Sequence, residues 1–182
     1  RMSEVAAEGR TVLFVSHNLG LIRALCKRGI LLEAGTVRFD GTAEDAVRDA
    51  RLVIIAAPIL ATRPLFEEIA PALMPGAIVT DCGSTKGNVM RWAKELLPET
   101  AHFVGGHPMA GKETSGIDAA DGDLFREKTW VVVPSVTADE SAVRTVVGLA
   151  QLCGATVTFM DADEHDSYVA AISHLPLALS SA

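Results

Sequence analysis

Five short aliphatic runs alternate with segments of helical periodicity along most of this chain, at residues 52–57, 77–80, 101–104, 129–133 and 156–160. Each run ends at or next to Pro, Gly or Asp, which is typical of strands in a sheet. The segments between them predict helices over residues 62–73, 88–97, 140–153 and 161–182. This alternation predicts an α/β fold with a doubly wound, mostly parallel sheet.

Composition narrows the class of protein. Hydrophobic residues make up 49% of the 182 residues and charged residues 21%, which indicates a globular chain. The net charge is −7 without a basic cluster, so we expect neither a nucleic-acid partner nor insertion into a membrane. The longest apolar run, residues 52–61, is too short to span a bilayer, and no signal peptide is expected. Three widely spaced cysteines fit reduced thiols in a cytoplasmic protein without a metal site.

A glycine-rich stretch, residues 105–111, follows the third run and is expected to form a loop at the carboxyl edge of the sheet. Its only side chain that titrates near neutral pH belongs to His107. We therefore predict that His107 is the acid/base residue of a dehydrogenase site. The alternative is a histidine that only holds the loop through a hydrogen bond.

From about residue 45 to the end, several short sequence motifs resemble those of prephenate/arogenate dehydrogenases and occur in the same order. They lie at residues 49–58, 81–87, 105–111, 161–166 and 173–176. The resemblance implies a Rossmann-like nucleotide-binding domain over residues 48–160. It also implies that residues 161–182 are the first helix of a helical dimerisation domain, which the chain carries only in truncated form. Residues 164–166 are expected to be a polar helix start rather than part of a site.

The family oxidises prephenate or arogenate with NAD or NADP in tyrosine biosynthesis, and carbon dioxide is lost as the ring becomes aromatic. The resemblance implies that His107 takes the proton of the substrate 4-hydroxyl group. Ser84 matches a serine that bonds the same hydroxyl group and lies beside the cofactor. The alternative for Ser84 is the N-cap of the helix expected from residue 88. The sequence does not choose between prephenate and arogenate, or between NAD and NADP.

The resemblance assigns the remaining site residues. Ser173 and His174 match the substrate side, where an interface histidine is the rival interpretation of His174. Glu113 matches a carboxylate near the substrate entrance, and its rival interpretation is a solvated loop acid. Ala57 and Pro58 match the loop that runs along the cofactor. No residue is assigned to a metal.

Residues 1–47 resemble a different family. The words at residues 9–18 and 28–35 are similar to the end of an ATP-binding subunit of a polysaccharide-exporting ABC transporter. In that family the residue matching His17 senses the γ-phosphate. No phosphate-cradling glycine loop precedes His17, so we do not expect this chain to hydrolyse ATP. His17 is instead expected to end a strand and cap the next helix.

The segment that resembles a transporter subunit stands where a dehydrogenase of this family is expected to carry its dinucleotide-binding motif. No G-x-G-x-x-G occurs in the chain, and residues 15–20 stand where it is expected. We predict that a strand at residues 11–15 fills the first place in the sheet but that cofactor binding is impaired. The alternatives are a non-catalytic hybrid or fragment and, less favoured, an ATP-binding fragment of a transporter.

Overall fold

The computed structural model describes residues 29–33, 36–111 and 121–174, with side chains from residue 41 to residue 172 within these ranges. Five strands form the main sheet: β3 (Leu52–Ile55), β4 (Ile78–Asp81), β5 (His102–Pro108), β6 (Thr129–Pro134) and β7 (Thr156–Phe159). The main helices are α4 (Ile59–Ile69), α5 (Gly87–Leu96), α6 (Glu140–Leu152) and α7 (Ala162–Val169). The predicted α/β class is therefore confirmed.

The strand order is β3-β4-β5-β6-β7. The pairs β3–β4, β4–β5 and β6–β7 are parallel, whereas β5 and β6 are antiparallel. The sheet is mostly parallel, as predicted, but its last two strands run opposite to the first three. No crossover helix lies in the described part of the β5–β6 connection, and parallel neighbours need such a crossover.

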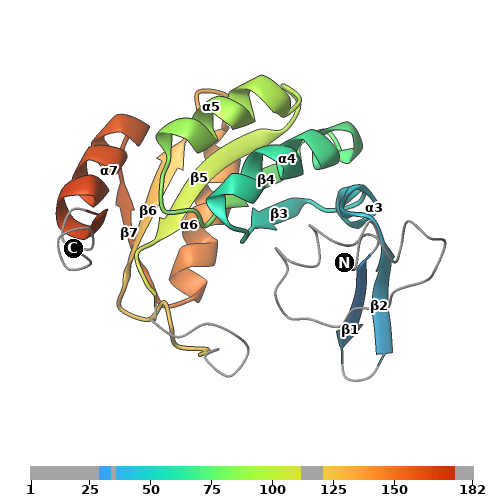
Figure 1. Cartoon of the computed structure of the whole chain (residues 1–182), viewed down its shortest axis with the longest axis horizontal. Helices are drawn as coiled ribbons and strands as arrows, with labels where there is room; N and C mark the ends of the chain where they lie inside the picture. Colours follow the sequence, from blue (N-terminus) through green and yellow to red (C-terminus); the bar gives the residue numbers. More distant parts are fainter. Residues whose placement is uncertain (1–28, 34–35, 112–120, 175–182) are drawn as a thin grey trace, which may run out of the picture.

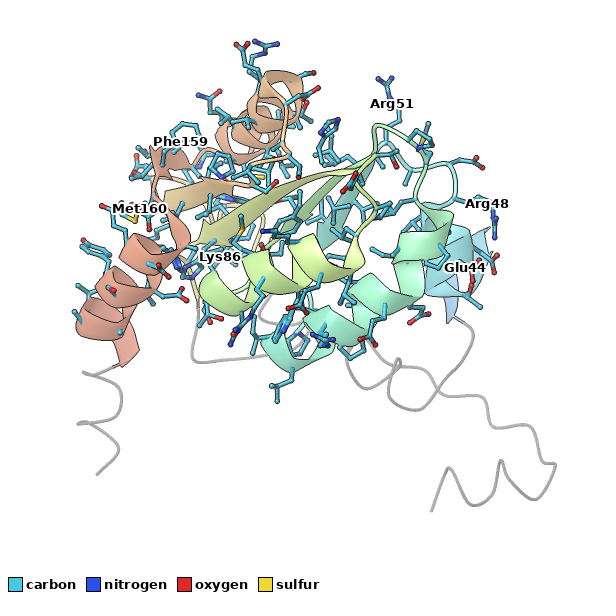
Figure 2. The ribbon with its side chains drawn as sticks, turned by 90° about the horizontal axis from the view of Figure 1, so that it is seen from above. Glu44, Arg48, Arg51, Lys86, Phe159 and Met160 are labelled. Carbon is cyan, nitrogen blue, oxygen red and sulfur yellow. The ribbon has the colours of Figure 1, made fainter. Side chains whose placement is uncertain are left out.

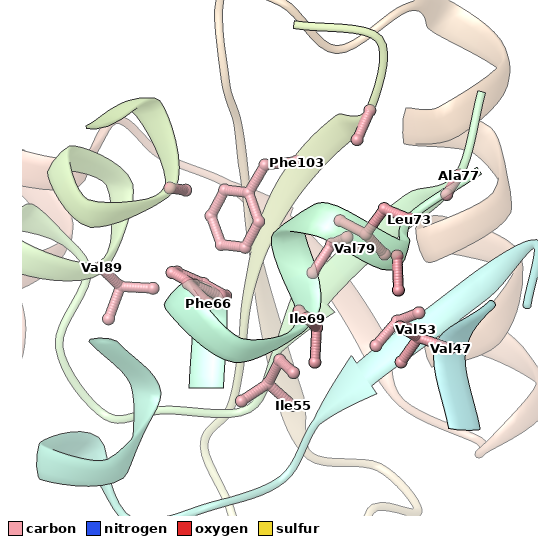
Figure 3. Close-up of a cluster of buried hydrophobic side chains, with 13 residues drawn as sticks. Val47, Val53, Ile55, Phe66, Ile69, Leu73, Ala77, Val79, Val89 and Phe103 are labelled. Atoms are coloured by element: carbon pink, nitrogen blue, oxygen red, sulfur yellow. The ribbon is translucent and has the colours of Figure 1, made fainter. Parts of the chain in front are cut away.

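Helices cover both faces of the sheet (Figure 1). On one face, α4 and α5 pack on odd-numbered sheet residues. Here the rings of Phe66 and Phe103 meet edge to face, with their centroids 5.5 Å apart (Figure 3). On the other face, α6 packs Val146 and neighbouring residues on Val104 and Val132. Because side chains alternate along a strand, the two faces carry two separate cores.

Capping residues fix where two of these helices begin. Asp139 accepts a hydrogen bond from the backbone N–H of Ala142 at the start of α6. Asp161 does the same for Glu164 at the start of α7. These bonds satisfy N–H groups that the first helical turn leaves without a partner.

The expected helix at residues 62–73 differs in its bounds. It begins at Ile59, directly after Pro58, and its α-helical part ends at Ile69, before a 3₁₀ turn, η1 (Ala70–Ala72). Pro71 lies inside this turn, and the lack of a proline N–H prevents the α-helix from continuing. The last expected helix comprises α7 and a π-type turn, η3 (Ala170–His174), and residues 175–182 lie outside the described residues.

The transporter-like segment is described only in part. β1 (Gly29–Glu33) and β2 (Thr36–Gly41) form an antiparallel hairpin. This hairpin is a sheet of its own, beside the short helix α3 (Ala43–Val47) and apart from the main sheet (Figure 1). The expected strand at residues 11–15 and His17 lie outside the described residues, so its place in the sheet stays a prediction.

No helix in the described ranges is long and apolar enough to cross a membrane.

Candidate active site

His107 lies on β5 rather than in a loop. The strand continues to Pro108 because residues 104–108 pair with β6, so the predicted loop at residues 105–108 is wrong. Sheet pairing and packing override the weak strand preference of the two glycines. Like Phe103, His107 occupies an odd-numbered position and faces the side of the sheet covered by α5 and α7.

His107 is buried, with 9% of its surface exposed, and meets a second histidine. Its Nδ1 atom lies 2.8 Å from the Nε2 atom of His165 on α7. The two rings stand edge to face with centroids 5.0 Å apart. His165 is fully buried, so the contact is shielded from water.

The other nitrogen of His165 meets a carboxylate. Its Nδ1 atom lies 2.8 Å from Oδ1 of Asp166. A carboxylate can only accept, so the proton of this bond belongs to His165. In a neutral His165 ring, Nε2 must then accept, and His107 donates its Nδ1–H. This leaves Nε2 of His107 as the basic nitrogen of the ring.

Asp166 also holds the start of α5. Its Oδ1 and Oδ2 atoms accept the backbone N–H groups of Lys86 at 2.7 Å and Gly87 at 2.9 Å. Partial burial acts to raise the pKa of Asp166, but these two N–H donors and the His165 ring outweigh it and lower the pKa. The carboxylate is therefore ionised at neutral pH and complements the positive end of the helix.

A buried ion pair lies below this helix end. The Lys86 ammonium group contacts Asp81 at the end of β4, and both side chains are almost completely buried. Asp81 also accepts the backbone N–H groups of Gly83 at 2.8 Å and Gly106 at 3.1 Å. Burial raises the pKa of Asp81, and the Lys86 charge opposes this shift. Figure 2 shows Lys86 at the end of α5 nearest to α7.

Gly106 brings β5 close to the end of β4. A Cβ atom at this position would lie 2.5 Å from the carbonyl oxygen of Asp81 and 3.0 Å from Nε1 of Trp130. Thr80 Oγ1 and Trp130 Nε1, both near this point, are the buried side-chain polar atoms without a partner in the described part of the chain. The site therefore requires glycine at position 106, and His107 follows it directly.

Ser84 lies at the same edge of the sheet, in the exposed loop after β4. It is not the N-cap of α5. The helix begins at Gly87, its N-cap is Lys86, and Asp166 supplies the capping oxygens instead. The alternative interpretation of Ser84 as a helix cap is thus wrong, whereas its bond to a substrate hydroxyl group stays a prediction.

Ala57 and Pro58 follow β3 at this edge, and Pro58 is the N-cap of α4 without a side-chain cap. Small or short side chains lie near this edge of the three parallel strands: Ala57 after β3, Gly83 and Ser84 after β4, and Gly105 and Gly106 within the last part of β5. A loop of small residues beside an open helix end suits the close approach of a dinucleotide. Residues 15–20, which stand where the glycine motif is expected, lie outside the described residues, so impaired cofactor binding stays a prediction.

The predicted substrate residues are only partly placed. Ser173 and His174 lie in η3, directly after α7, and their side chains are not described. Glu113 lies outside the described residues. The roles given to these three residues stay predictions.

Sequence reasoning missed the partners of His107. It treated residues 164–166 as a polar helix start, whereas His165 and Asp166 extend inward from α7. One signal was available: His165 and Val169 are four residues apart and share one helix face, and the apolar Val169 indicates that this face points inward. Lys86 and Asp81 gave no such signal, because a buried lysine cannot be distinguished from a surface lysine by spacing.

Cys82 and Cys153 are free and partly buried. Burial raises the pKa of the Cys82 thiol to about 11, so it is protonated at neutral pH and a poor nucleophile. Within the described residues, no group of three or more His, Cys, Asp or Glu side chains is placed to hold a metal ion.

A Rossmann-like sheet with a buried histidine at the carboxyl ends of its parallel strands defines a nucleotide-binding domain of dehydrogenase type. The family model "Prephenate dehydrogenase, nucleotide-binding domain" matches residues 26–159. The chain belongs to this family. The match begins before residue 48, so the boundary placed near residue 47 stays a prediction.

Similar proteins agree with this family. Prephenate dehydrogenase of Bacillus subtilis is 38% identical over 131 residues, which are 71% of this chain and 35% of that protein. The crystal structure of prephenate dehydrogenase from Aquifex aeolicus in complex with hydroxyphenyl propionate and NAD+ matches with a TM-score of 0.68 and 30% identity. That match covers 75% of this chain and 48% of the other. The chain thus spans about a third to a half of the length of these relatives.

The second resemblance is also found. The teichoic acids export ATP-binding protein of Listeria monocytogenes is 40% identical over 48 residues, which are 26% of this chain and 14% of that protein. The chain therefore carries sequence similar to two different families, as predicted.

Proposed function

We propose that this chain carries the catalytic base of a prephenate or arogenate dehydrogenase. Family membership supports the reaction class, and one geometric observation carries the assignment of the base. Nδ1 of His107 faces Nε2 of His165, whose own Nδ1 atom faces the Asp166 carboxylate; with both rings neutral, this chain of contacts puts the proton of His107 on Nδ1 and its lone pair on Nε2.

The reaction requires one proton acceptor. The substrate 4-hydroxyl proton passes to Nε2 of His107 while hydride leaves the same carbon. The bond from the ring to its carboxylate breaks and carbon dioxide departs; the electron pair of that bond makes the ring aromatic, and the oxygen takes its proton back from His107 as the product phenol forms. NAD or NADP, when bound, supplies the hydride acceptor. A positioned base of this kind contributes about 10²- to 10⁴-fold to the rate.

Other residues hold the reactants in the same proposal. Ser84 donates to or accepts from the substrate hydroxyl group, and Ala57 and Pro58 lie along the cofactor. Ser173, His174 and Glu113 contact the substrate. Cofactor affinity is impaired, because residues 15–20 place His17 and Asn18 where the motif has glycines. In the same proposal the protein is cytoplasmic, and the helix that begins at residue 161 belongs to a dimerisation domain.

The test is reduction of NAD and of NADP with prephenate and with arogenate at high protein concentration. His107→Asn should lower turnover at least a hundredfold. His102→Asn, on the same strand, is the control and should retain it. Turnover of His107→Asn within about twofold of the parent would overturn the assignment. A nicotinamide-cofactor dissociation constant in the micromolar range would contradict impaired binding.

A second candidate is a non-catalytic hybrid. The missing glycine motif and the short transporter-like match favour it. It predicts no substrate-dependent cofactor reduction at any protein concentration, with the fold intact by circular dichroism.

A further inference from the structure

Asp166 joins two parts of the fold that are far apart in sequence. It lies on α7, and its carboxylate accepts the backbone N–H groups of Lys86 and Gly87, 80 and 79 residues away. The first N–H groups of a helix have no partner within that helix. Because Lys86 provides no side-chain cap, Asp166 caps α5 from another element.

The same carboxylate accepts a third hydrogen bond, from Nδ1 of His165 at 2.8 Å. Two of the three donors are backbone groups in fixed positions, and both oxygen atoms are used. The other charged groups nearby do not compete for it, since the Lys86 ammonium group is paired with Asp81. The carboxylate is therefore held in one orientation, aimed at one nitrogen of His165.

This orientation determines where the protons of both rings lie. With a carboxylate at its Nδ1 atom, a neutral His165 places its proton there and accepts at Nε2. His107 then donates from Nδ1 and keeps the lone pair on Nε2. If His165 instead carried its proton on Nε2, it would donate to His107, and a neutral His107 would have its proton on Nε2. In that form His107 has no basic nitrogen on the side away from His165.

We propose that Asp166 is a positioning residue that sets the tautomer of His107 through His165, and that it does so only while α7 is docked on the start of α5. The contact that caps the helix and the contact that fixes the base share one carboxylate. Helix docking and base formation are thus one event. The importance of the tautomer for turnover rests on the proposed function of His107, whereas the tautomer itself can be measured without turnover.

Gly87 and the Asp166 carboxylate lie so close together that a substitution at Gly87 can serve as a second variant. A Cβ atom at Gly87 would lie 3.1 Å from Oδ2 of Asp166. Gly87→Ala therefore moves the helix end and the carboxylate apart by a few tenths of an ångström without removing any polar group. Asp166→Asn removes the charge and replaces one acceptor oxygen with a donor, so it cannot accept all three bonds.

The experiment is nitrogen-15 NMR of labelled histidine side chains in the full chain, because the shifts of the two ring nitrogens identify the protonated one. The parent should carry its protons on Nδ1 in both His107 and His165. In Asp166→Asn the ratio of Nε2-protonated to Nδ1-protonated His107 should rise about tenfold or more, since a charge-assisted hydrogen bond is lost. Gly87→Ala should change this ratio in the same direction by less.

Asp163→Asn is the matched control, because Asp163 is an exposed carboxylate in the first turn of the same helix. It should leave both tautomers unchanged. A parent protein with the proton of His165 on Nε2 overturns the proposal without any variant, as does a folded Asp166→Asn protein with parental tautomers. If Asp166→Asn does not fold, the parent spectrum and Gly87→Ala decide.

The ring tautomers and the turnover are measured independently of each other. Parental tautomers as expected, with no turnover of prephenate or arogenate, would leave the positioning inference intact and remove the function. If His107→Asn loses turnover but the tautomers do not respond to Asp166→Asn, the proposed function stands and the positioning inference is removed.

Discussion

The Nδ1 atom of His107 lies 2.8 Å from the Nε2 atom of His165, although the two residues are 58 positions apart. His107 is the second-last residue of β5, and His165 lies on α7, the helix that follows the last strand of the sheet. Both rings are buried, so the two nitrogen atoms that face each other satisfy one another away from water. The pair therefore joins α7 to the sheet at the residue proposed as the base.

Replacing His165 with Phe should test this tie. The ring volume is nearly kept, but His107 loses its acceptor and Asp166 loses a donor. We expect the free energy of unfolding to fall by about 1–3 kcal/mol, the cost of leaving a buried donor unsatisfied. Urea unfolding measures it. Tyr168→Phe, on the exposed side of α7, is the control, and equal stability of the two variants would contradict the expectation.

The Asp81–Lys86 pair predicts a pH-dependent defect. In Lys86→Met the buried carboxylate loses its counter-charge, which costs about 3–5 kcal/mol when a buried pair is broken. Burial already raises the pKa of Asp81, and loss of Lys86 removes an opposing cause. A raised carboxyl pKa destabilises the fold above the unfolded pKa near 4, and the penalty grows until pH reaches the folded pKa.

The defect of Lys86→Met should therefore be largest at neutral pH and shrink as the pH is lowered toward 4. Urea unfolding of the parent and the variant across this range measures it. Lys94→Met, an exposed lysine on the same helix, should change the free energy of unfolding by about 0.5 kcal/mol or less. A defect of Lys86→Met that does not depend on pH would show that Asp81 is not the group responsible.

The contribution of Asp166 to stability depends on pH in the opposite direction. Its pKa is lowered: partial burial opposes the shift, but the N–H donors of Gly87 and Lys86 outweigh it. Its contribution to stability is present above the unfolded pKa near 4 and is lost as pH falls through the lower folded pKa. The stability difference between the parent and Asp166→Asn should thus shrink as the solution is acidified below about pH 4. Asp163→Asn should show no such convergence, and parallel acid profiles for all three proteins would refute this expectation.

Much of the framework followed from short-range signals. Alternating apolar runs predicted the strands from β3 to β7, and Asp139 and Asp161 lie where helix caps are expected. The reversal at β6 was missed because strand direction depends on a connection that has no local signature. Gly105 and Gly106 were assigned to a loop because glycine disfavours strands, whereas pairing with β6 decides their conformation.

The sequence predicted one residue of the site but not its partners. His107 stands in a conspicuous sequence word, but its partners come from α7, and contact between these elements arises only in the folded protein. Asp166 was misread because capping was sought within α5 and its own preceding loop, at Ser84. A carboxylate 80 residues away that caps a helix leaves no pattern in the sequence.

Gly106 predicts a steric effect with internal controls. Ala at position 106 places a Cβ atom 2.5 Å from the carbonyl oxygen of Asp81, so the strands must separate. We expect a loss of about 1–3 kcal/mol or more, as in overpacked cores. Gly122→Ala, with no atom within 4 Å, should be nearly neutral. Gly148→Ala, exposed within α6, should stabilise the protein by about 0.4–1 kcal/mol. Thermal and urea unfolding of the three variants measure these stabilities. A Gly106→Ala protein as stable as Gly122→Ala would contradict the expectation.

Ser84 offers a separation of structural and chemical roles. Because Asp166 caps α5, removing the Ser84 hydroxyl group should change the free energy of unfolding by about 0.5 kcal/mol or less. If the hydroxyl group binds the substrate 4-hydroxyl as proposed, Ser84→Ala should lower turnover about tenfold or more. Urea unfolding and cofactor reduction on the same preparation measure both. Thr85→Val, the neighbouring hydroxyl, is the control. A destabilised Ser84→Ala protein with undiminished turnover per folded molecule would assign Ser84 to structure and remove it from the site.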